Sequence, residues 1–200
     1  FLHMLSSLEY PTSGYVTYGK KKLSDYTDNQ LSILRRRRFG FVFQAYNLVN
    51  ELTGYENIVL PVMLDKKKPD EEYIDKLIKM LGIEDRLDHL PSALSGGQQQ
   101  RIAIARALAN KPAILFADEP TGSLNRNASD EVMDELVKLN KEGTTVMMVT
   151  HDARVAARCS RVLYLVDGNI KGEYKSPAGG DVKEKDRERM LNNWLMELGW

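Results

Sequence analysis

Cysteine, long apolar runs and net charge are what this chain of 200 residues has least of. Its single cysteine, Cys159, excludes an internal disulfide and leaves no second thiol for a paired metal site. No apolar run approaches the roughly 20 residues that cross a bilayer, and the first residues lack a secretory pattern, so we expect neither feature. Lysine plus arginine and aspartate plus glutamate each number 28, so we expect no general attraction to nucleic acid.

Local basic runs do occur, at Lys20–Lys22, Arg35–Arg38 and Lys66–Lys68. A short run of like charge is most often a solvated face or loop, and we interpret all three in this way. A chain of this length can form one domain with a sizeable core and a smaller attached lobe.

Apolar, β-rich segments alternate with helical ones in the second half of the chain. The expected strands are 113–117, 144–149 and 162–166, and the expected helices are 98–109, 128–140 and 152–158. Such alternation predicts an α/β fold with a mostly parallel sheet covered by helices on both faces. A further strand is expected at 39–43, whereas residues 51–92 show only helical patterning, interrupted by Pro61, and predict an all-helical insertion.

The end of the chain has a different character. Residues 176–182 indicate a linker, and 167–169 indicate a turn into a short hairpin. A helical stripe then contains Met190, Leu191, Trp194, Leu195 and Leu198. We expect this stripe to pack onto its own domain, with docking to a partner as the alternative.

The octapeptide LSGGQQQR at 94–101 is the most informative stretch. Ser95 suits a helix N-cap, and Gln98 completes a capping box. Gly96 and Gly97 have no Cβ, so an anion could approach the unpaired N–H groups of the helix start. The octapeptide alone does not distinguish an anion site from a well-capped buried helix.

Polar side chains follow three of the expected strands. Asp118 and Glu119 come after one, His151 after the next, and Gln44 after the strand at 39–43. Ligands of open parallel sheets bind beyond the carboxyl ends of the strands. There a carboxylate such as Asp118 could lie near Mg²⁺, and Glu119 could align or deprotonate a water for phosphoryl transfer. Each group alone could equally be a polar turn, but their coincidence with the helix start at Ser95 favours a site for phosphate or metal.

Together these segments resemble the nucleotide-binding subunit of ABC transporters, from Phe1 to about Gly172. The resemblance rests on the Q-loop FVFQ, the signature LSGGQQQR, the Walker B run ILFADEP, the D-loop-like TGSLN and the H-loop THD. PTSG at 11–14 and LTGYENIVLP at 52–61 further resemble one branch of the family. That branch contains the lipoprotein-release, macrolide-export and antimicrobial-peptide-resistance ATPases, together with the cell-division ATPase.

The resemblance implies a P-loop NTPase (RecA-like) fold with an all-helical subdomain, and ATP and Mg²⁺ as cofactors. Asp118 would hold Mg²⁺ through water and Glu119 would be the general base. His151 would contact the γ-phosphate, and Gln44 would reach Mg²⁺ and the attacking water.

Further residues would act on nucleotide bound by a second subunit in a head-to-tail dimer, which we expect to be a homodimer. Those in contact with its γ-phosphate would be Ser95, Gly96, Gly97 and Gln98. Asn125 would lie in the D-loop that connects the two sites. The family usually has Asp at that place, so communication between the sites could differ here.

The resemblance also implies a transmembrane permease as partner and a place at the cytoplasmic face of the membrane. Residues 1–175 would form the nucleotide-binding domain, with 51–97 as its helical signature subdomain, and 176–200 a linker and an amphipathic helix. The function would be ATP-driven export or membrane extraction of a substrate.

The phosphate loop G-x-x-x-x-G-K-[ST] of such subunits is missing from these residues, and so are the strands expected before it. The stretch from Gly14 to Lys21 has the spacing but ends in Lys21, which has no hydroxyl for Mg²⁺, and its centre is strand-like. In the family the loop directly precedes a helix like that expected at 2–8. We therefore expect a truncated N-terminus, and little or no ATP binding and hydrolysis by residues 1–200 alone.

Two alternatives to a transport ATPase remain at this point. One is a non-hydrolysing module that docks a partner through the signature helix and the insertion, although Glu119 and His151 argue against a retired ATPase. The other is an ATPase of a non-transport membrane complex, as in cell division, which the same motifs would serve.

Overall fold

The computed structural model describes residues 1–176 and 183–200, in two compact units, 1–149 and 150–200. The predicted linker at 176–182 lies almost wholly outside the described residues. No helix of the described residues is long and apolar enough to span a bilayer.

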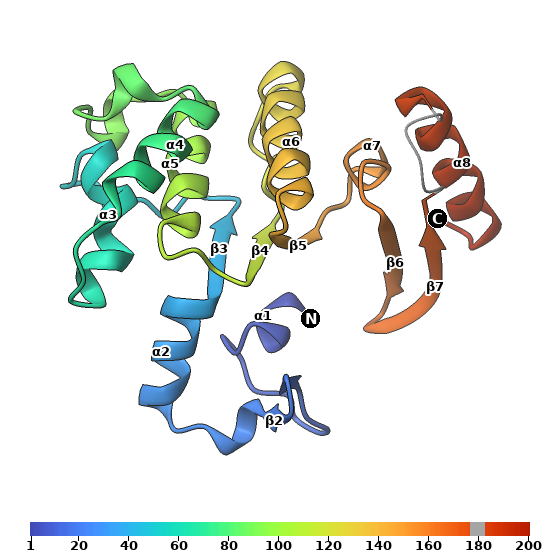
Figure 1. The fold of residues 1–200 in the computed structure, drawn as a ribbon. Coiled ribbons are helices and arrows are strands. Elements are labelled where there is room, and N and C mark those ends of the chain that lie inside the picture. The colour runs from blue at the N-terminus through green and yellow to red at the C-terminus, as the bar shows by residue number, and fades with distance from the viewer. Residues whose placement is uncertain (177–182) are drawn as a thin grey trace. The chain divides into compact units, whose positions relative to one another are not determined.

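The first unit is built on a parallel sheet in the order β3 (Phe39–Phe43), β4 (Ile114–Asp118) and β5 (Thr145–Val149) (Figure 1). Phe39 pairs with Ile114, and Ile114 with Thr145, so the carboxyl ends of all three strands lie at one edge. The α/β fold with a parallel sheet is therefore confirmed. The expected strand at 162–166 is not part of this three-stranded sheet and lies in the second unit.

Helices cover both faces of the sheet. Phe39 points into a cluster with Leu2, Leu31 and Phe116, formed with α1 (Leu2–Leu5) and α2 (Asp28–Arg38). The next residue, Gly40, faces the opposite way because side chains alternate along a strand. A Cβ at Gly40 would lie 2.5 Å from the carbonyl oxygen of Ala107 in α5 (Gly96–Leu108), so this helix packs directly against β3.

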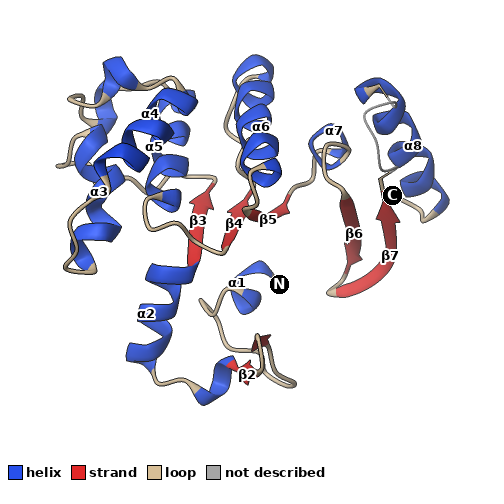
Figure 2. Ribbon diagram, in the orientation of Figure 1, coloured by secondary structure: helices blue, strands red, loops and turns tan. Residues whose placement is uncertain are grey.

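The predicted insertion is helical, with α3 (Gly54–Leu64) and α4 (Glu71–Leu81) beside α5 and short 3₁₀ turns at Glu84–Arg86 and Pro91–Ala93 (Figures 1 and 2). Pro61 does not interrupt α3 but lies inside it, near its C-terminal end. There the proline removes one backbone hydrogen bond without ending the helix. Thr53 and Glu56 form a capping box at the start of α3, and α4 ends on Gly82 at φ 60°.

A buried amide shapes the entry to α3. Asn57 has no exposed surface, and its Oδ1 accepts from the Val49 N–H at 2.8 Å. Its Nδ2 lies 3.0 Å from the carbonyl oxygens of Val49, Leu52 and Thr53. One side chain of the helix therefore fixes the fold of the loop that precedes it.

The remaining elements of the first unit are short or peripheral. The hairpin β1 (Thr17–Tyr18) with β2 (Lys21–Lys22) leads into a 3₁₀ turn at Leu23–Asp25. The last helix of this unit, α6 (Arg126–Lys141), buries Val132, Met133 and Leu136 and precedes β5.

The second unit contains α7 (Ala153–Ala156), the antiparallel pair β6 (Arg161–Val166) with β7 (Asn169–Lys175), and α8 (Glu184–Glu197). The hairpin turn predicted at 167–169 is confirmed. Leu191 and Leu195 of α8 are buried with Ala157, and the Trp194 ring lies 5.6 Å from that of Tyr174. The stripe thus packs largely onto its own unit, as expected, although Met190 and Leu198 stay partly exposed.

Asp65 lies directly after α3. Because of its environment, we expect the free energy of unfolding to depend on pH in the acid range. Hydrogen bonds from Lys67 and then Arg37 lower the pKa of its carboxyl from 3.8 to about 2. A carboxyl whose pKa falls on folding stabilises the protein above its unfolded pKa and loses that contribution as the pH drops through the folded pKa. We therefore expect the free energy of unfolding to fall between pH 3.8 and about 2, and to fall less steeply in Asp65→Asn.

Urea denaturation at several pH values measures this slope. The exposed Asp75→Asn is the matched control and should keep the slope of the unsubstituted protein. Identical slopes in Asp65→Asn and the unsubstituted protein would contradict the assignment.

Candidate functional site

The signature segment begins α5 as predicted. The Ser95 hydroxyl accepts from the Gln98 N–H at 3.3 Å, and the Gln98 side-chain oxygen accepts from the Ser95 N–H at 2.9 Å. This is the expected capping box, and it leaves the first N–H groups of a 13-residue helix directed outward from its start. Such a helix start favours an anion.

The two glycines of this segment differ in what surrounds them. A Cβ at Gly96 would lie 2.6 Å from the Tyr46 hydroxyl, whereas one at Gly97 would lie 3.3 Å from the Ala128 methyl. Position 96 therefore requires glycine, because any side chain there would clash with the Tyr46 hydroxyl. Gly97 meets only a methyl group of α6.

The turn after β4 is strained at Glu119. This residue has φ 45°, in the left-handed region that costs a non-glycine residue free energy. Its N–H donates to the Val149 carbonyl at 3.0 Å, and its own carbonyl accepts from the Gly122 N–H at 3.0 Å. The backbone bonds hold Glu119 in this conformation at the carboxyl edge of the sheet.

Gln44 and Glu119 meet at that edge, as the strand-end argument predicts. A Cβ at Gly122 would lie 2.9 Å from the Gln44 amide nitrogen and 3.4 Å from the Glu119 Cβ. The absent side chain at Gly122 makes room for the Gln44 amide beside the Glu119 turn. The Gln44 amide and the Cβ of Glu119, which follow neighbouring strands, thus lie around one small residue.

Asp118 ends β4 next to an unexpected neighbour. His3 Nε2 lies 3.5 Å from an Asp118 carboxylate oxygen, and both side chains are partly exposed. The sequence offered no reason to connect His3 with the site, because the contact joins α1 to a strand more than a hundred residues away.

The residues at this edge fit Mg²⁺ as a partner of bound phosphate. Mg²⁺ prefers oxygen ligands and is usually held by one or two carboxylates together with substrate phosphates and water. Asp118 supplies a carboxylate and Gln44 an amide oxygen at the same edge. Among the described residues no cluster of three or more His, Cys, Asp or Glu side chains could hold a metal on its own.

Three residues that sequence reasoning missed hold the Gln44 loop. Tyr46 and Asn47 have φ of 61° and 50°, and their carbonyl oxygens accept from the Arg106 guanidinium at 2.8 and 2.5 Å. Burial lowers the pKa of Arg106. Arg106 interrupts the otherwise apolar stretch 102–109, and this charge was the signal that could have marked the residue, though not its partners.

Ser123 connects this loop to the turn after Glu119. Its hydroxyl lies 3.1 Å from the Gln44 carbonyl oxygen and 3.0 Å from the Tyr46 hydroxyl. Because the carbonyl can only accept, Ser123 donates to it and the Tyr46 hydroxyl donates to Ser123. Tyr46 therefore links three segments, namely the Gln44 loop, the Ser123 turn and, at Gly96, the start of α5.

Asn125 is the N-cap of α6, and its side-chain oxygen accepts from the Ala128 N–H at 3.0 Å. Asn and Asp are similarly good at this capping position, so the helix start would form with either. The difference between them is the negative charge alone.

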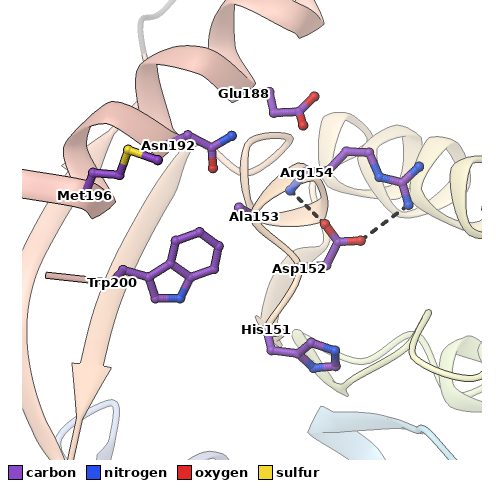
Figure 3. Close-up of a pocket in the computed structure, with 8 residues that line it drawn as sticks. All are labelled: His151, Asp152, Ala153, Arg154, Glu188, Asn192, Met196 and Trp200. Carbon is purple, nitrogen blue, oxygen red and sulfur yellow. Dashed lines mark hydrogen bonds and ion pairs between the residues drawn. The ribbon is translucent and has the colours of Figure 1, made fainter.

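His151 belongs to the second unit. It lines an open cavity of about 540 Å³ whose other lining residues include Asp152, Arg154, Glu188 and Trp200 (Figure 3). Asp152 caps α7 and pairs with Arg154, with 3.3 Å between carboxylate oxygen and guanidinium nitrogen. The turn that carries His151 is thus fixed by its neighbours.

Comparisons with known proteins show which family this chain resembles. The family model described as ABC transporter matches residues 1–122. An uncharacterized ABC transporter ATP-binding protein of Methanocaldococcus jannaschii is 46% identical over 173 residues, which cover 84% of this chain and 76% of that protein. The lipoprotein-releasing system ATP-binding protein LolD of Aquifex aeolicus is 45% identical over 175 residues, 86% of this chain and 78% of that protein.

Solved structures are similar as well. The dimeric ABC transporter cassette MJ0796 has a TM-score of 0.80 and 42% identity, over 89% of this chain and 80% of that one. The same cassette bound to ADP and Pi, in a post-hydrolysis state, also has a TM-score of 0.80, with 41% identity and the same coverage of both chains. The chain therefore belongs to the ATP-binding ABC transporter family, which is a family of ATPases.

Proposed function

We propose that this protein is the subunit that couples ATP hydrolysis to export or membrane extraction of a substrate. The observation that carries the proposal is the meeting of Gln44 and the strained Glu119 turn around Gly122, at the carboxyl edge of the sheet. The names of the relatives, a lipoprotein-releasing system protein and macrolide export proteins, support export or extraction as the coupled process.

The chemistry assigned to this edge is the attack of water on the γ-phosphate of ATP. Glu119 accepts the proton of that water as general base, and the Gln44 amide orients the water from the neighbouring strand. Asp118 would hold Mg²⁺ through water, and the ion would neutralise charge on the phosphates. His151 donates a hydrogen bond to the γ-phosphate.

The signature helix is assigned to nucleotide on a second copy of the chain. The N–H groups that follow the Ser95 cap point outward from α5, as an acceptor on another subunit requires. The assigned contacts come from Ser95, Gly96, Gly97 and Gln98, and Asn125 lies where a D-loop would join the two sites. The dimeric form of the similar cassette supports a homodimer.

The proposed partner is a transmembrane permease, and the proposed place is the cytoplasmic face of the membrane. Residues 1–175 are assigned to the nucleotide-binding domain, 51–97 to its helical signature subdomain, and 176–200 to a linker and C-terminal helix. No role in nucleic acid binding is assigned, since the net charge is zero.

A chimera tests the proposed function. A phosphate-loop segment taken from the Aquifex aeolicus relative is placed before Phe1, and phosphate release from ATP is measured. We expect turnover by the chimera and none above buffer by the polypeptide of residues 1–200, which contains no such loop. A folded chimera that binds ATP without hydrolysing it would favour the partner-docking module instead.

A further inference from the structure

Two basic runs that lie 28 or more residues apart in the sequence meet in the first unit. Arg36 and Arg37 belong to the last turn of α2, and Lys66–Lys68 follow α3. The carboxylate of Asp65, whose side chain has no exposed surface, joins them. It lies 3.0 Å from Arg36 Nε, 2.9 Å from Arg37 Nε and 2.6 Å from Lys67 Nζ. We call Arg36, Arg37 and Lys66–Lys68 the basic surface.

The basic surface is held in place by further contacts. An Arg36 guanidinium nitrogen donates to the Leu64 carbonyl at 2.9 Å. The Asn110 amide donates to the carbonyls of Arg36 and Pro61, at 2.9 and 3.2 Å. The end of α2 and the end of α3 are therefore fixed beside each other, and the cations are a feature of the fold.

Positive charge accumulates here on a chain with no net charge. The basic surface carries five cationic side chains, and the Asp65 carboxylate contacts three of them, Arg36, Arg37 and Lys67. Lys66 and Lys68 are exposed and form no ion pair with any described residue. From the sequence we expected each basic run to be a separate solvated face or loop. Separate runs would not produce this local excess of positive charge.

Exposed apolar side chains adjoin the basic surface. Met63 and Leu64, in the last turn of α3, are 57% and 60% exposed. Apolar tips beside lysines and arginines are the pattern of segments that bind at the interface of an anionic bilayer. Long lysine side chains on an open loop match a diffuse layer of headgroups better than one defined acidic segment.

We propose that the basic surface binds the anionic headgroups of a lipid bilayer, with Met63 and Leu64 entering the headgroup layer. This contact orients the ATP-binding unit against the membrane independently of nucleotide. It is separate from the proposed ATP chemistry, because no residue of the basic surface lies among the residues assigned to catalysis.

Vesicle co-sedimentation of the protein, without nucleotide, tests the proposal. We expect binding to phosphatidylcholine vesicles that contain phosphatidylglycerol, little binding to phosphatidylcholine alone, and weakening with added salt. Since each cation near an anionic surface contributes about 1 kcal/mol, the double variant Lys66→Glu with Lys68→Glu should bind at least about tenfold more weakly. Leu64→Gln should weaken binding without changing its dependence on salt.

The matched control is Lys20→Glu with Lys22→Glu, which reverses two exposed lysines of the same spacing in another run of the same unit. It should bind like the unsubstituted protein. Circular dichroism checks that each variant is folded. If the variant with Lys66→Glu and Lys68→Glu is unfolded, the variant with Lys66→Gln and Lys68→Gln takes its place. Equal losses in the two lysine pairs, or no preference for phosphatidylglycerol, would overturn the proposal. Stronger binding to polyglutamate or duplex DNA than to the vesicles would replace the membrane with a polypeptide or nucleic acid partner.

Discussion

Replacing Glu119 by Gln in the phosphate-loop chimera is expected to reduce the turnover number for ATP by about 100-fold or more, the usual contribution of a general base. The variant keeps the length of the side chain and its hydrogen-bonding capacity, so the left-handed turn at φ 45° should form unchanged. Only the ability to accept the proton of the attacking water is lost. Phosphate release under saturating ATP measures the effect.

A second readout separates lost chemistry from lost binding. If Glu119 acts only on the attacking water, ATP still binds and the dimer that it closes should accumulate, which size-exclusion chromatography detects. The exposed Glu72→Gln is the control and should keep full turnover. Turnover by Glu119→Gln within a few-fold of the unsubstituted chimera would remove Glu119 from the mechanism.

Replacing Gly40 by Ala is expected to lower the free energy of unfolding by about 2–3 kcal/mol, at the upper end of the usual cost of overpacking. The added methyl would lie 2.5 Å from the Ala107 carbonyl oxygen and 2.9 Å from a Leu115 methyl. A helix backbone cannot move aside as a flexible side chain can, so α5 must separate from β3. Urea denaturation measures the change.

Gly97→Ala, in the helix α5 against which Gly40 packs, provides the comparison. Its added methyl meets only the Ala128 methyl, at 3.3 Å, and a helical position favours alanine over glycine. We expect its free energy of unfolding to stay within about 1 kcal/mol of the original, the size of the difference between glycine and alanine in a helix. Equal stability of Gly40→Ala and Gly97→Ala would show that the helix tolerates displacement from the strand.

The sequence predicted the parts of the site that depend on local pattern. The Ser95 capping box follows from residue types three positions apart, and the parallel sheet follows from apolar strands that alternate with helices. From the sheet followed the meeting of Gln44 with Glu119, since parallel strands bring their carboxyl ends to one edge.

The contacts between distant segments could not be predicted. Nothing in the sequence near Arg106 indicates that its guanidinium holds the carbonyls of a loop about 60 residues earlier. The left-handed conformations of Tyr46, Asn47 and Glu119 could not be predicted from the sequence either, because none of these residues is the glycine that usually marks such a turn. The basic surface could not be predicted either, since its two runs are joined by contacts between distant segments, such as those that Asp65 makes with Arg36 and Arg37.

Asn57 and Arg106 together make the segment between Gln44 and α3 rigid. Arg106 clamps the start of this stretch to α5, and the Asn57 amide clamps its end to α3. A segment held at both ends cannot absorb a small displacement by bending. We therefore expect a displacement of the Gln44 backbone to be passed on to the helical insertion.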